Sequence, residues 1–142
     1  MSKLRAVMDT NVLVAAFRSR SGASFDIFER LRRDEWIAVL SNHLIYEYEE
    51  ILKQEAPALS LGLTDVDQIL NAISARGEEW PLTHNWDPIL TDPSDEPLAQ
   101  LAQESGALVI VTHNTRHLQP ATKLGIEVLK PREFLVRLRQ SK

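Results

Sequence analysis

Four short, mainly apolar runs alternate along this chain with longer segments whose apolar residues recur at helical spacing. The runs contain β-branched residues and are bounded by polar residues or glycine, which is typical of buried strands. They occupy residues 4–8, 36–40, 107–111 and 126–129. Buried strands that alternate with helices predict the α/β class, as a three-layer α/β/α sandwich with a central, mainly parallel sheet.

The intervening segments place apolar residues three or four positions apart, so that one face of each helix can pack on a sheet. Predicted helices cover residues 24–33, 42–54, 64–76, 97–105 and 131–139, and a further buried helix includes residues 12–17. Thr64 followed by Asp67 suggests a capping box, and Pro131 suits a first helical turn. Residues 78–94, rich in Trp, Pro and Asp, are predicted to form a surface connection with room for a short strand.

The length of 142 residues fits a single domain, 1–142, which can bury a core without metals or disulfides as supports. The absence of cysteine excludes thiol catalysis, Cys-ligated zinc and disulfides, and is consistent with a reducing cytosol. Asp9 and Asn11 interrupt the apolar region after the basic start, and no apolar run is long enough to span a bilayer. We therefore expect a soluble, cytoplasmic protein with no membrane partner.

The net charge of −4 argues against a simple basic nucleic-acid binder, but the charge is unevenly distributed. Residues 44–104 are strongly acidic, whereas residues 1–43 and 105–142 carry a net positive charge. Such a chain can present an acidic pocket beside basic patches. Ordinary solvated surface charge would produce the same pattern, so composition alone does not decide between them.

The tripeptide Asp9-Thr10-Asn11 directly follows the first predicted strand. Open α/β sheets bind ligands outside the carboxyl ends of their strands, so the Asp9 carboxylate is placed where it can point into a crevice. Asp, Thr and Asn are also common helix N-caps. The local sequence leaves both roles open for Asp9.

Acidic residues on two predicted helices can reach the same sheet edge. On helix 42–54, Glu47 and Glu49 flank the apolar stripe, and either can lean inward or stay in solvent. Asp92, Asp95 and Glu96 precede helix 97–105, where capping and the helix dipole also favour acidic residues. Helical geometry alone does not choose among these carboxylates.

A polar cluster follows the predicted strand 107–111, again at the edge where ligands bind. It contains two histidines, His113 and His117, which are equally compatible with an ordinary loop.

Several motifs in this chain share their order and spacing with one known family. They are Val7 to Leu13, Glu47 to Leu52, Asp92 to Asp95 before Leu98-Ala99 and Leu101-Ala102, Val111-Thr112, and Glu133 to Leu135. In these motifs, over roughly residues 4–136, the chain resembles the PIN-domain family, specifically the bacterial and archaeal branch of toxin components. No single motif is decisive, and the resemblance rests on the set.

The resemblance implies a PIN-like fold and a Mg²⁺- or Mn²⁺-dependent ribonuclease. It maps the acidic residues of the family onto Asp9, Glu47 and Asp95, and so favours Glu47 over Glu49. Its fourth acidic position falls on Asn114, or on His117 if a longer spacing applies. Some family members carry Asn there; its carbonyl lacks charge but accepts a hydrogen bond from a metal-bound water.

Three carboxylates suit one Mg²⁺ or Mn²⁺ ion, because both prefer oxygen ligands. Hydrogen bonds that hold these carboxylates are expected from Thr10, Asn11 and Thr112. Arg116 is expected to hold the phosphate backbone of an RNA substrate. The resemblance also implies a toxin of a toxin–antitoxin pair, with a cognate antitoxin and a homodimer as partners.

Two rival interpretations remain at this point. A catalytically degenerate PIN domain would bind RNA or a protein without cutting, and Asn114 keeps this alternative open. An Asp-nucleophile phosphohydrolase would use Asp9 to attack phosphate, but the second Asp of that superfamily, two positions on, is Asn11 here.

Overall fold

A computed structural model describes residues 3–83 and 85–140 of the chain. Its sheet has five strands, all parallel, in the order β3-β2-β1-β4-β5. The strands are β1 (Leu4–Met8), β2 (Trp36–Leu40), β3 (Gly77–Glu79), β4 (Val109–Val111) and β5 (Glu127–Leu129). The four predicted strands are present, and β3 begins at the start of the connection where a short strand was expected.

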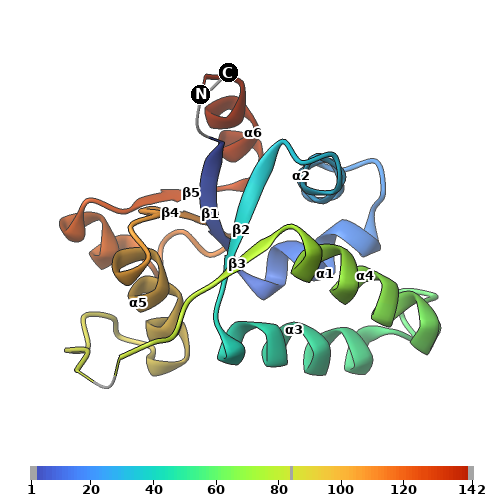
Figure 1. Ribbon diagram of the computed structural model, residues 1–142, viewed down its shortest axis with the longest axis horizontal. Helices are drawn as coiled ribbons and strands as arrows, with labels where there is room; N and C mark the ends of the chain where they lie inside the picture. Colours follow the sequence, from blue (N-terminus) through green and yellow to red (C-terminus); the bar gives the residue numbers. More distant parts are fainter. Residues whose placement is uncertain (1–2, 84, 141–142) are drawn as a thin grey trace.

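Six α-helices are described, with two short 3₁₀ helices: η1 lies directly before α5, and η2 follows β4. They are α1 (Thr10–Arg18), α2 (Ala23–Arg32), α3 (Asn42–Glu55), α4 (Leu63–Ala75), η1 (Pro93–Asp95), α5 (Glu96–Glu104), η2 (Gln119–Leu124) and α6 (Pro131–Gln140). In Figure 1, α1, α2 and α4 lie together on one side of the sheet and α5 on the other. This confirms the predicted α/β/α fold. No described helix has both the length and the apolar character needed to cross a membrane.

The predicted capping box at Thr64 and Asp67 is wrong. Helix α4 begins earlier, with Gly62 at its N-cap, and the Asp65 carboxylate accepts a 2.8 Å hydrogen bond from the Gly62 backbone N–H. Thr64 therefore lies inside the first turn of α4, and Asp65 is the residue whose carboxylate satisfies a free N–H at the helix start.

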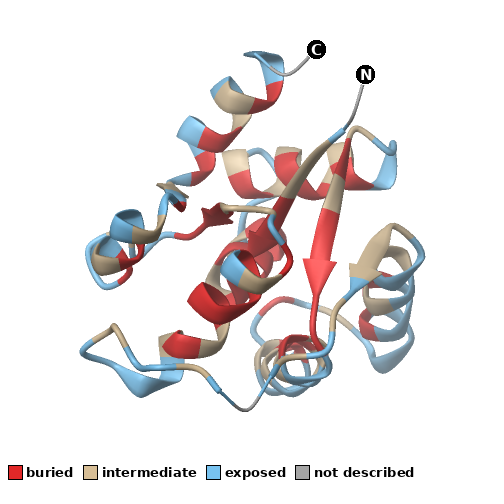
Figure 2. Ribbon diagram, turned by 60° about the vertical axis from the view of Figure 1, so that its left-hand side comes forward, coloured by how far each residue is buried: buried red, intermediate tan, exposed pale blue. Residues whose placement is uncertain are grey.

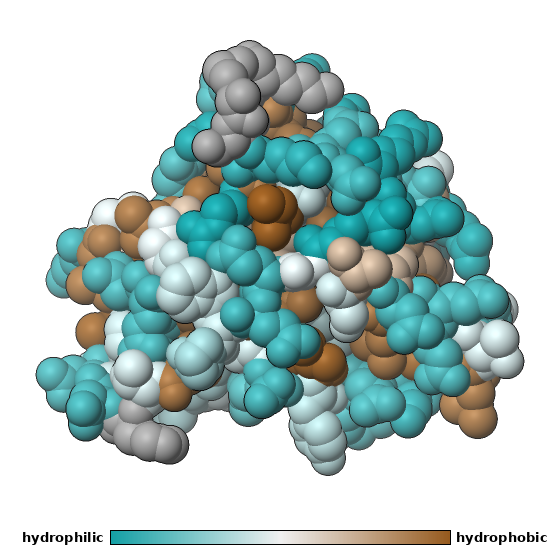
Figure 3. Space-filling model, viewed as in Figure 1, coloured by the Kyte–Doolittle hydropathy of each residue, from teal (hydrophilic) through white to brown (hydrophobic). Residues whose placement is uncertain are grey.

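The core is centred on β1 and β2, whose last three residues are all buried, and Figure 2 shows the middle of the molecule as mainly buried. At the start of β2, the fully buried Trp36 donates a 3.0 Å hydrogen bond from its indole nitrogen to the Ile27 carbonyl in α2. Its ring packs edge-on against Phe134 of α6, with centroids 5.1 Å apart. Trp36 thus joins two helices to the sheet. Figure 3 shows that hydrophilic side chains cover most of one outer face, with apolar groups only in small separate areas.

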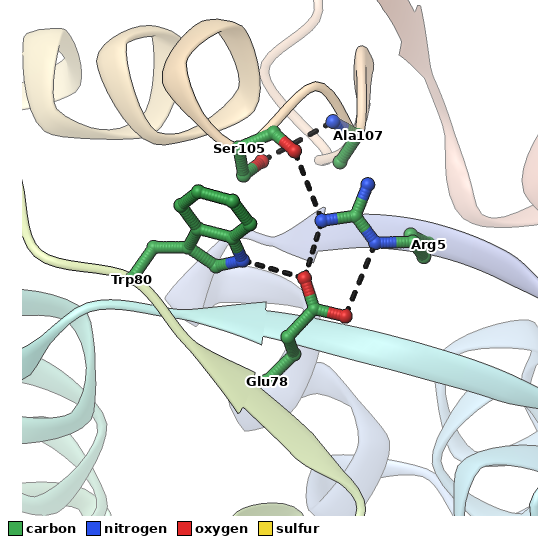
Figure 4. A network of polar contacts seen from close by, with 5 residues as sticks. All are labelled: Arg5, Glu78, Trp80, Ser105 and Ala107. Carbon is green, nitrogen blue, oxygen red and sulfur yellow. Dashed lines mark hydrogen bonds and ion pairs between the residues drawn. The ribbon is translucent and has the colours of Figure 1, made fainter.

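A polar network secures the edge strand β3, whose sequence is not apolar (Figure 4). The Arg5 guanidinium of β1 binds both oxygens of Glu78, with its Nε 3.2 Å from Oε2, and also donates to the Ser105 carbonyl at 2.9 Å. The Trp80 indole donates to the same Glu78 carboxylate. Arg5 is the main reason that the pKa of Glu78 lies below its usual value. The network therefore ties β1, β3 and the end of α5 together.

The strand order places a topological switch point between β1 and β4. The chain builds outward from β1 through β2 to β3, and then returns to add β4 on the other side of β1. Open α/β sheets bind ligands at such a point, outside the carboxyl ends of the strands. Met8 is in register with Val111, so Asp9 and Thr112 leave the sheet side by side.

Candidate active site

Asp9 occupies the N-cap position of α1, but its side chain forms no capping hydrogen bond. Its Oδ2 instead accepts a 2.7 Å hydrogen bond from the Thr112 hydroxyl, across the switch point. The residue is only 8% exposed. Of the two roles that the sequence left open, helix capping is therefore not the one that the Asp9 carboxylate performs.

The pKa of Asp9 is raised from 3.8 to about 6, mainly by burial and to a smaller extent by the charges of Asp95 and Glu47. The hydrogen bond from Thr112 and, least of all, the Asn11 backbone N–H oppose this rise. A like charge nearby disfavours the ionised form of a carboxyl group. The carboxylates of Asp9, Glu47 and Asp95 therefore share one electrostatic environment at the carboxyl edge of the sheet.

Glu47 reaches this edge because its neighbour on α3 is fixed to β1. Tyr48 is completely buried, and its hydroxyl donates to the Met8 carbonyl at the end of β1. With Tyr48 in place, Glu47 lies beside the start of α1, where its Oε1 accepts a hydrogen bond from the Thr10 hydroxyl. Glu49 instead pairs with Lys53 on the exposed side of the helix, at 3.0 Å.

Of the three acidic residues around the start of α5, Asp92 and Glu96 have structural tasks. Asp92 caps η1, where its Oδ1 accepts hydrogen bonds from the backbone N–H of Ser94 at 3.0 Å and from the Ser94 hydroxyl at 2.8 Å. Glu96 is buried and accepts hydrogen bonds from the Trp86 indole at 2.7 Å and from the backbone N–H groups of Ile89 and Leu90. Glu96 thereby anchors the connection that precedes it.

Asp95, the third, stands at the N-cap position of α5 without a capping hydrogen bond from its side chain. Its pKa is raised, first by partial burial and then by the charge of Asp92, and smaller increases come from Glu47 and Glu96. His117 opposes these effects. Asp95 is therefore the one of the three whose carboxylate is left for the candidate site.

The Thr112 hydroxyl is the centre of the hydrogen bonds that hold this edge together. Besides donating to Asp9, it accepts from the Asn114 backbone N–H at 3.0 Å and from the Asn11 side-chain nitrogen at 3.4 Å. The Asn11 side-chain oxygen accepts from the His113 backbone N–H at 3.3 Å. The Thr112 hydroxyl contacts Asp9 and the Thr10 hydroxyl contacts Glu47, whereas the Asn11 side chain contacts Thr112 and the loop after β4.

The turn after Thr112 carries the remaining predicted residues. Asn114 and Arg116 are both exposed, and the Asn114 carbonyl accepts a 3.1 Å hydrogen bond from the His117 backbone N–H. His117 acts electrostatically on both Asp92 and Asp95. Of the two alternatives for the fourth family position, His117 is thus the one whose side chain interacts with a carboxylate of the cluster.

Two further histidines lie beside the cluster: His43, which was not predicted, and His113, which the sequence leaves open as a loop residue. His43 lies one helical turn before Glu47, with its Nε2 3.8 Å from the Glu47 Oε2, and its i,i+4 spacing is a signal that the sequence does contain. The ring of His113 contacts Ser24 of α2, with Nε2 and Oγ 3.1 Å apart. That contact joins residues far apart in the chain, so no local pattern predicts it.

The candidate site fits a divalent cation by the chemistry of its donors. Asp9, Glu47 and Asp95 supply carboxylate oxygens, which Mg²⁺ and Mn²⁺ prefer. Within residues 3–83 and 85–140, however, no three His, Asp or Glu side chains are already arranged closely enough to hold a metal ion. The hydrogen bonds from Thr10 and Thr112 hold two of the carboxylates individually.

A comparison with known families identifies the family of the chain. A family model described as "PIN domain" matches residues 5–116, a span that includes Asp9, Glu47, Asp95 and Asn114. No curated protein matches the chain. Because the matched span is most of the sequence, the chain belongs to the PIN-domain family.

Proposed function

We propose that this protein is an endoribonuclease that uses Mg²⁺ or Mn²⁺, held by Asp9, Glu47 and Asp95, to hydrolyse RNA phosphodiester bonds. PIN domains are generally nucleases, and this fold is of the nuclease type. The observation that carries the proposal is the placement of Asp9 and Glu47 at the carboxyl edge of the sheet, where Thr112 and Thr10 hold their carboxylates. The raised pKa of Asp9, which burial and the charges of Asp95 and Glu47 produce, agrees with this placement.

Such an arrangement is unfavourable for a purely structural site. Three carboxylates, from the end of β1, from α3 and from the N-cap of α5, act on one another electrostatically although their charges repel. A bound cation reverses this effect, because it favours the ionised form of every carboxylate around it. Repulsion among the three carboxylates is therefore consistent with a role in binding an ion.

A bound divalent ion would supply an activated water and stabilise negative charge on the phosphoryl oxygens. The residues of the chain would orient the reacting groups. Thr112 and Thr10 hold the carboxylates of Asp9 and Glu47, and the Asn114 side chain would accept a hydrogen bond from the attacking water. Arg116, exposed in the same turn, would hold the RNA backbone through its charge.

The resemblance to toxin components also supports a biological role that we include in the proposal. The protein would act in the cytoplasm as the toxin of a toxin–antitoxin pair, as a homodimer that a cognate antitoxin restrains. Co-purification of the protein with the product of an adjacent reading frame tests the antitoxin, and sedimentation of the purified protein tests the dimer.

The degenerate PIN domain is the second candidate function, and Asn114 is the observation that favours it. An Asn at the fourth position contributes no negative charge, which weakens the hold on a second, loosely bound ion. Under this alternative the protein binds RNA equally well with and without Mn²⁺ and does not shorten it.

One assay separates the two candidates. A 5′-labelled single-stranded RNA is incubated with the protein in Mn²⁺ or in EDTA, beside an Asp9→Asn variant. The proposal predicts cleavage only by the parent protein and only with Mn²⁺. Cleavage at equal rates by Asp9→Asn would overturn the role of Asp9, and binding without cleavage would establish the degenerate domain.

A further inference from the structure

A cavity of about 430 Å³ shares the loop after β4 with the candidate active site. Its walls come from the end of α1, the first turn of α2, the loop after β4 and the first turn of α6. Cavities of this size accommodate small ligands in proteins. The residues that matter to its chemistry are Ala15, Ser24, His113, Lys130 and Arg132.

The cavity and the carboxylate cluster share one loop. His113, which lines the cavity, follows Thr112, the residue that donates to Asp9. The His113 backbone N–H donates to Asn11, two residues after Asp9, and its ring is held at the other end by Ser24. If the phosphate of an RNA chain lies at the carboxylate of Asp9, a ligand in the cavity would therefore lie beside that RNA chain.

The lining combines the three features that a nucleotide needs. Ala15, Ala23 and Pro131 provide apolar surface, and the His113 ring provides a flat group against which a base can stack. Lys130 and Arg132 are exposed cations at one side.

One acidic residue, Glu133, also lines the cavity, and its charge opposes that of the cations. Its Oε1 accepts a 2.8 Å hydrogen bond from the Lys130 backbone N–H, so the carboxylate is occupied at the start of α6. Partial burial lowers the pKa of His113, which favours the neutral ring over the cationic one and suits a base more than a phosphate. The cationic side chains of Lys130 and Arg132 are then the groups that meet an anion.

We propose that this cavity binds one nucleotide of a single-stranded RNA, next to the nucleotide that is cleaved, with the base beside His113 and the phosphate at Lys130 and Arg132. The inference rests on the proposed nuclease function and adds a subsite to it. It predicts a preference for single strands, because a base within a duplex cannot enter a cavity.

Binding is tested without metal and without cleavage, through the ring signals of the four histidines in NMR spectra. The His113 signal is assigned as the one missing from His113→Gln. Adenosine and uridine 5′-monophosphates are then titrated into the parent protein. The proposal predicts a saturable shift of the His113 signal that inorganic phosphate does not reproduce.

Three variants locate the ligand. Ala15→Met fills the cavity without changing its charge, and Lys130→Gln with Arg132→Gln removes the cations while leaving the apolar wall. Both are predicted to weaken nucleotide binding at least about threefold. Arg139→Gln, an exposed change at the far end of the same α6 helix, is the control and is predicted to leave binding unchanged.

The result that overturns the proposal is a His113 signal that does not respond to either nucleotide, or a response equal to that of inorganic phosphate. A response that survives both Ala15→Met and the Lys130→Gln, Arg132→Gln double variant also overturns it. Because the double variant changes only exposed side chains, it keeps the test valid if Ala15→Met fails to fold.

Cleavage kinetics separate failure of the subsite from failure of the nuclease function. The cavity variants are predicted to raise KM for a short RNA severalfold with kcat nearly unchanged, whereas Asp9→Asn loses kcat. If cleavage depends on Asp9 but KM is unchanged in the cavity variants, the subsite alone is wrong. If nucleotides bind at His113 but Asp9→Asn cleaves normally, the nuclease assignment of the carboxylates is wrong.

Discussion

The hydroxyl of Thr112 donates a 2.7 Å hydrogen bond to the carboxylate of Asp9, across a sequence separation of 103 residues. The two residues meet because β1 and β4 are parallel neighbours and both end at the same edge of the sheet. This bond turns the Asp9 side chain away from the helix that it precedes and toward the switch point. It is the contact that makes Asp9 a candidate ligand rather than a cap.

Replacing Thr112 by Val removes this donor while keeping the shape of the side chain. The pKa of Asp9 is expected to rise further, because the bond to Thr112 is what lowers it. Loss of a buried hydrogen bond costs about 1–3 kcal/mol of folding free energy. Chemical denaturation measures the loss and ¹³C NMR titration of the carboxyl group measures the pKa. Thr115→Val, in the same loop, is the control, and an unchanged Asp9 pKa in Thr112→Val would contradict the account.

The stability of the metal-free protein is expected to fall as pH rises through the interval between 3.8 and about 6. In this interval the unfolded chain loses the Asp9 proton while the folded chain keeps it, so ionisation favours unfolding. At 1.36 kcal/mol per pKa unit, the full effect above pH 6 is about 3 kcal/mol.

Asp9→Asn abolishes this effect, since the Asn amide oxygen still accepts from Thr112 but does not titrate. Thermal unfolding from pH 3.5 to 8 without divalent ions is expected to show the variant more stable than the parent above pH 6. The two should converge below pH 4. If the stability of the two proteins changed with pH in the same way over the whole range, the pKa of Asp9 would not be raised in the folded protein.

Tyr48→Phe tests how α3 delivers Glu47 to the edge. The variant loses the hydrogen bond from the buried Tyr48 hydroxyl to the Met8 carbonyl, at an expected cost of about 1–3 kcal/mol in folding free energy. Because that bond fixes the helix position next to Glu47, RNA cleavage is expected to fall as well. Tyr46→Phe is the matched control, since Tyr46 lies on the same helix and is 65% exposed. Equal losses in the two variants would remove the positioning role of Tyr48.

Asn114→Asp is expected to strengthen Mn²⁺ binding by adding a negative charge beside the ion, most visibly for a second and weaker site. The direction of the change in Mn²⁺ affinity is the test. Its size is small, because a carboxylate partly shielded by solvent interacts through a high effective dielectric. Calorimetric titration of both proteins with Mn²⁺ decides it. Weaker or unchanged binding would place Asn114 outside the site, as a residue of the turn that Thr112 and His117 define.

The predictable parts of the fold were those whose residues carry their own signal. Strands β1 and β2 are continuous apolar runs that lie between helices, and their predicted bounds match the structure. Strand β3 is Gly77-Glu78-Glu79 and has no such signal. It pairs with β2 because Gly77 packs where a Cβ would lie 2.2 Å from Leu40, and because Arg5 reaches Glu78 from a distant part of the chain.

In the candidate site, too, some features follow from the sequence pattern and others depend on long-range contacts. Parallel strands bring their carboxyl ends to one edge, so the meeting of Asp9 and the loop after β4 follows from the predicted topology. The choice of Glu47 over Glu49 depends on one long-range bond, from Tyr48 to Met8, which no helical periodicity contains. Likewise, only the folded connection shows that Glu96 and Asp92 are engaged elsewhere while Asp95 is not.

The most direct measurement of the central claim compares Glu47→Gln with Glu49→Gln in Mn²⁺-dependent cleavage of a labelled single-stranded RNA under single-turnover conditions. Both changes remove one charge from α3, but only Glu47 lies beside Thr10 and acts on Asp9, whereas Glu49 pairs with Lys53. The account predicts that Glu47→Gln slows cleavage at least about 100-fold, equivalent to ~2.7 kcal/mol of transition-state stabilisation, and that Glu49→Gln leaves it unchanged. Equal rates for the two variants would contradict a shared metal site of Asp9, Glu47 and Asp95.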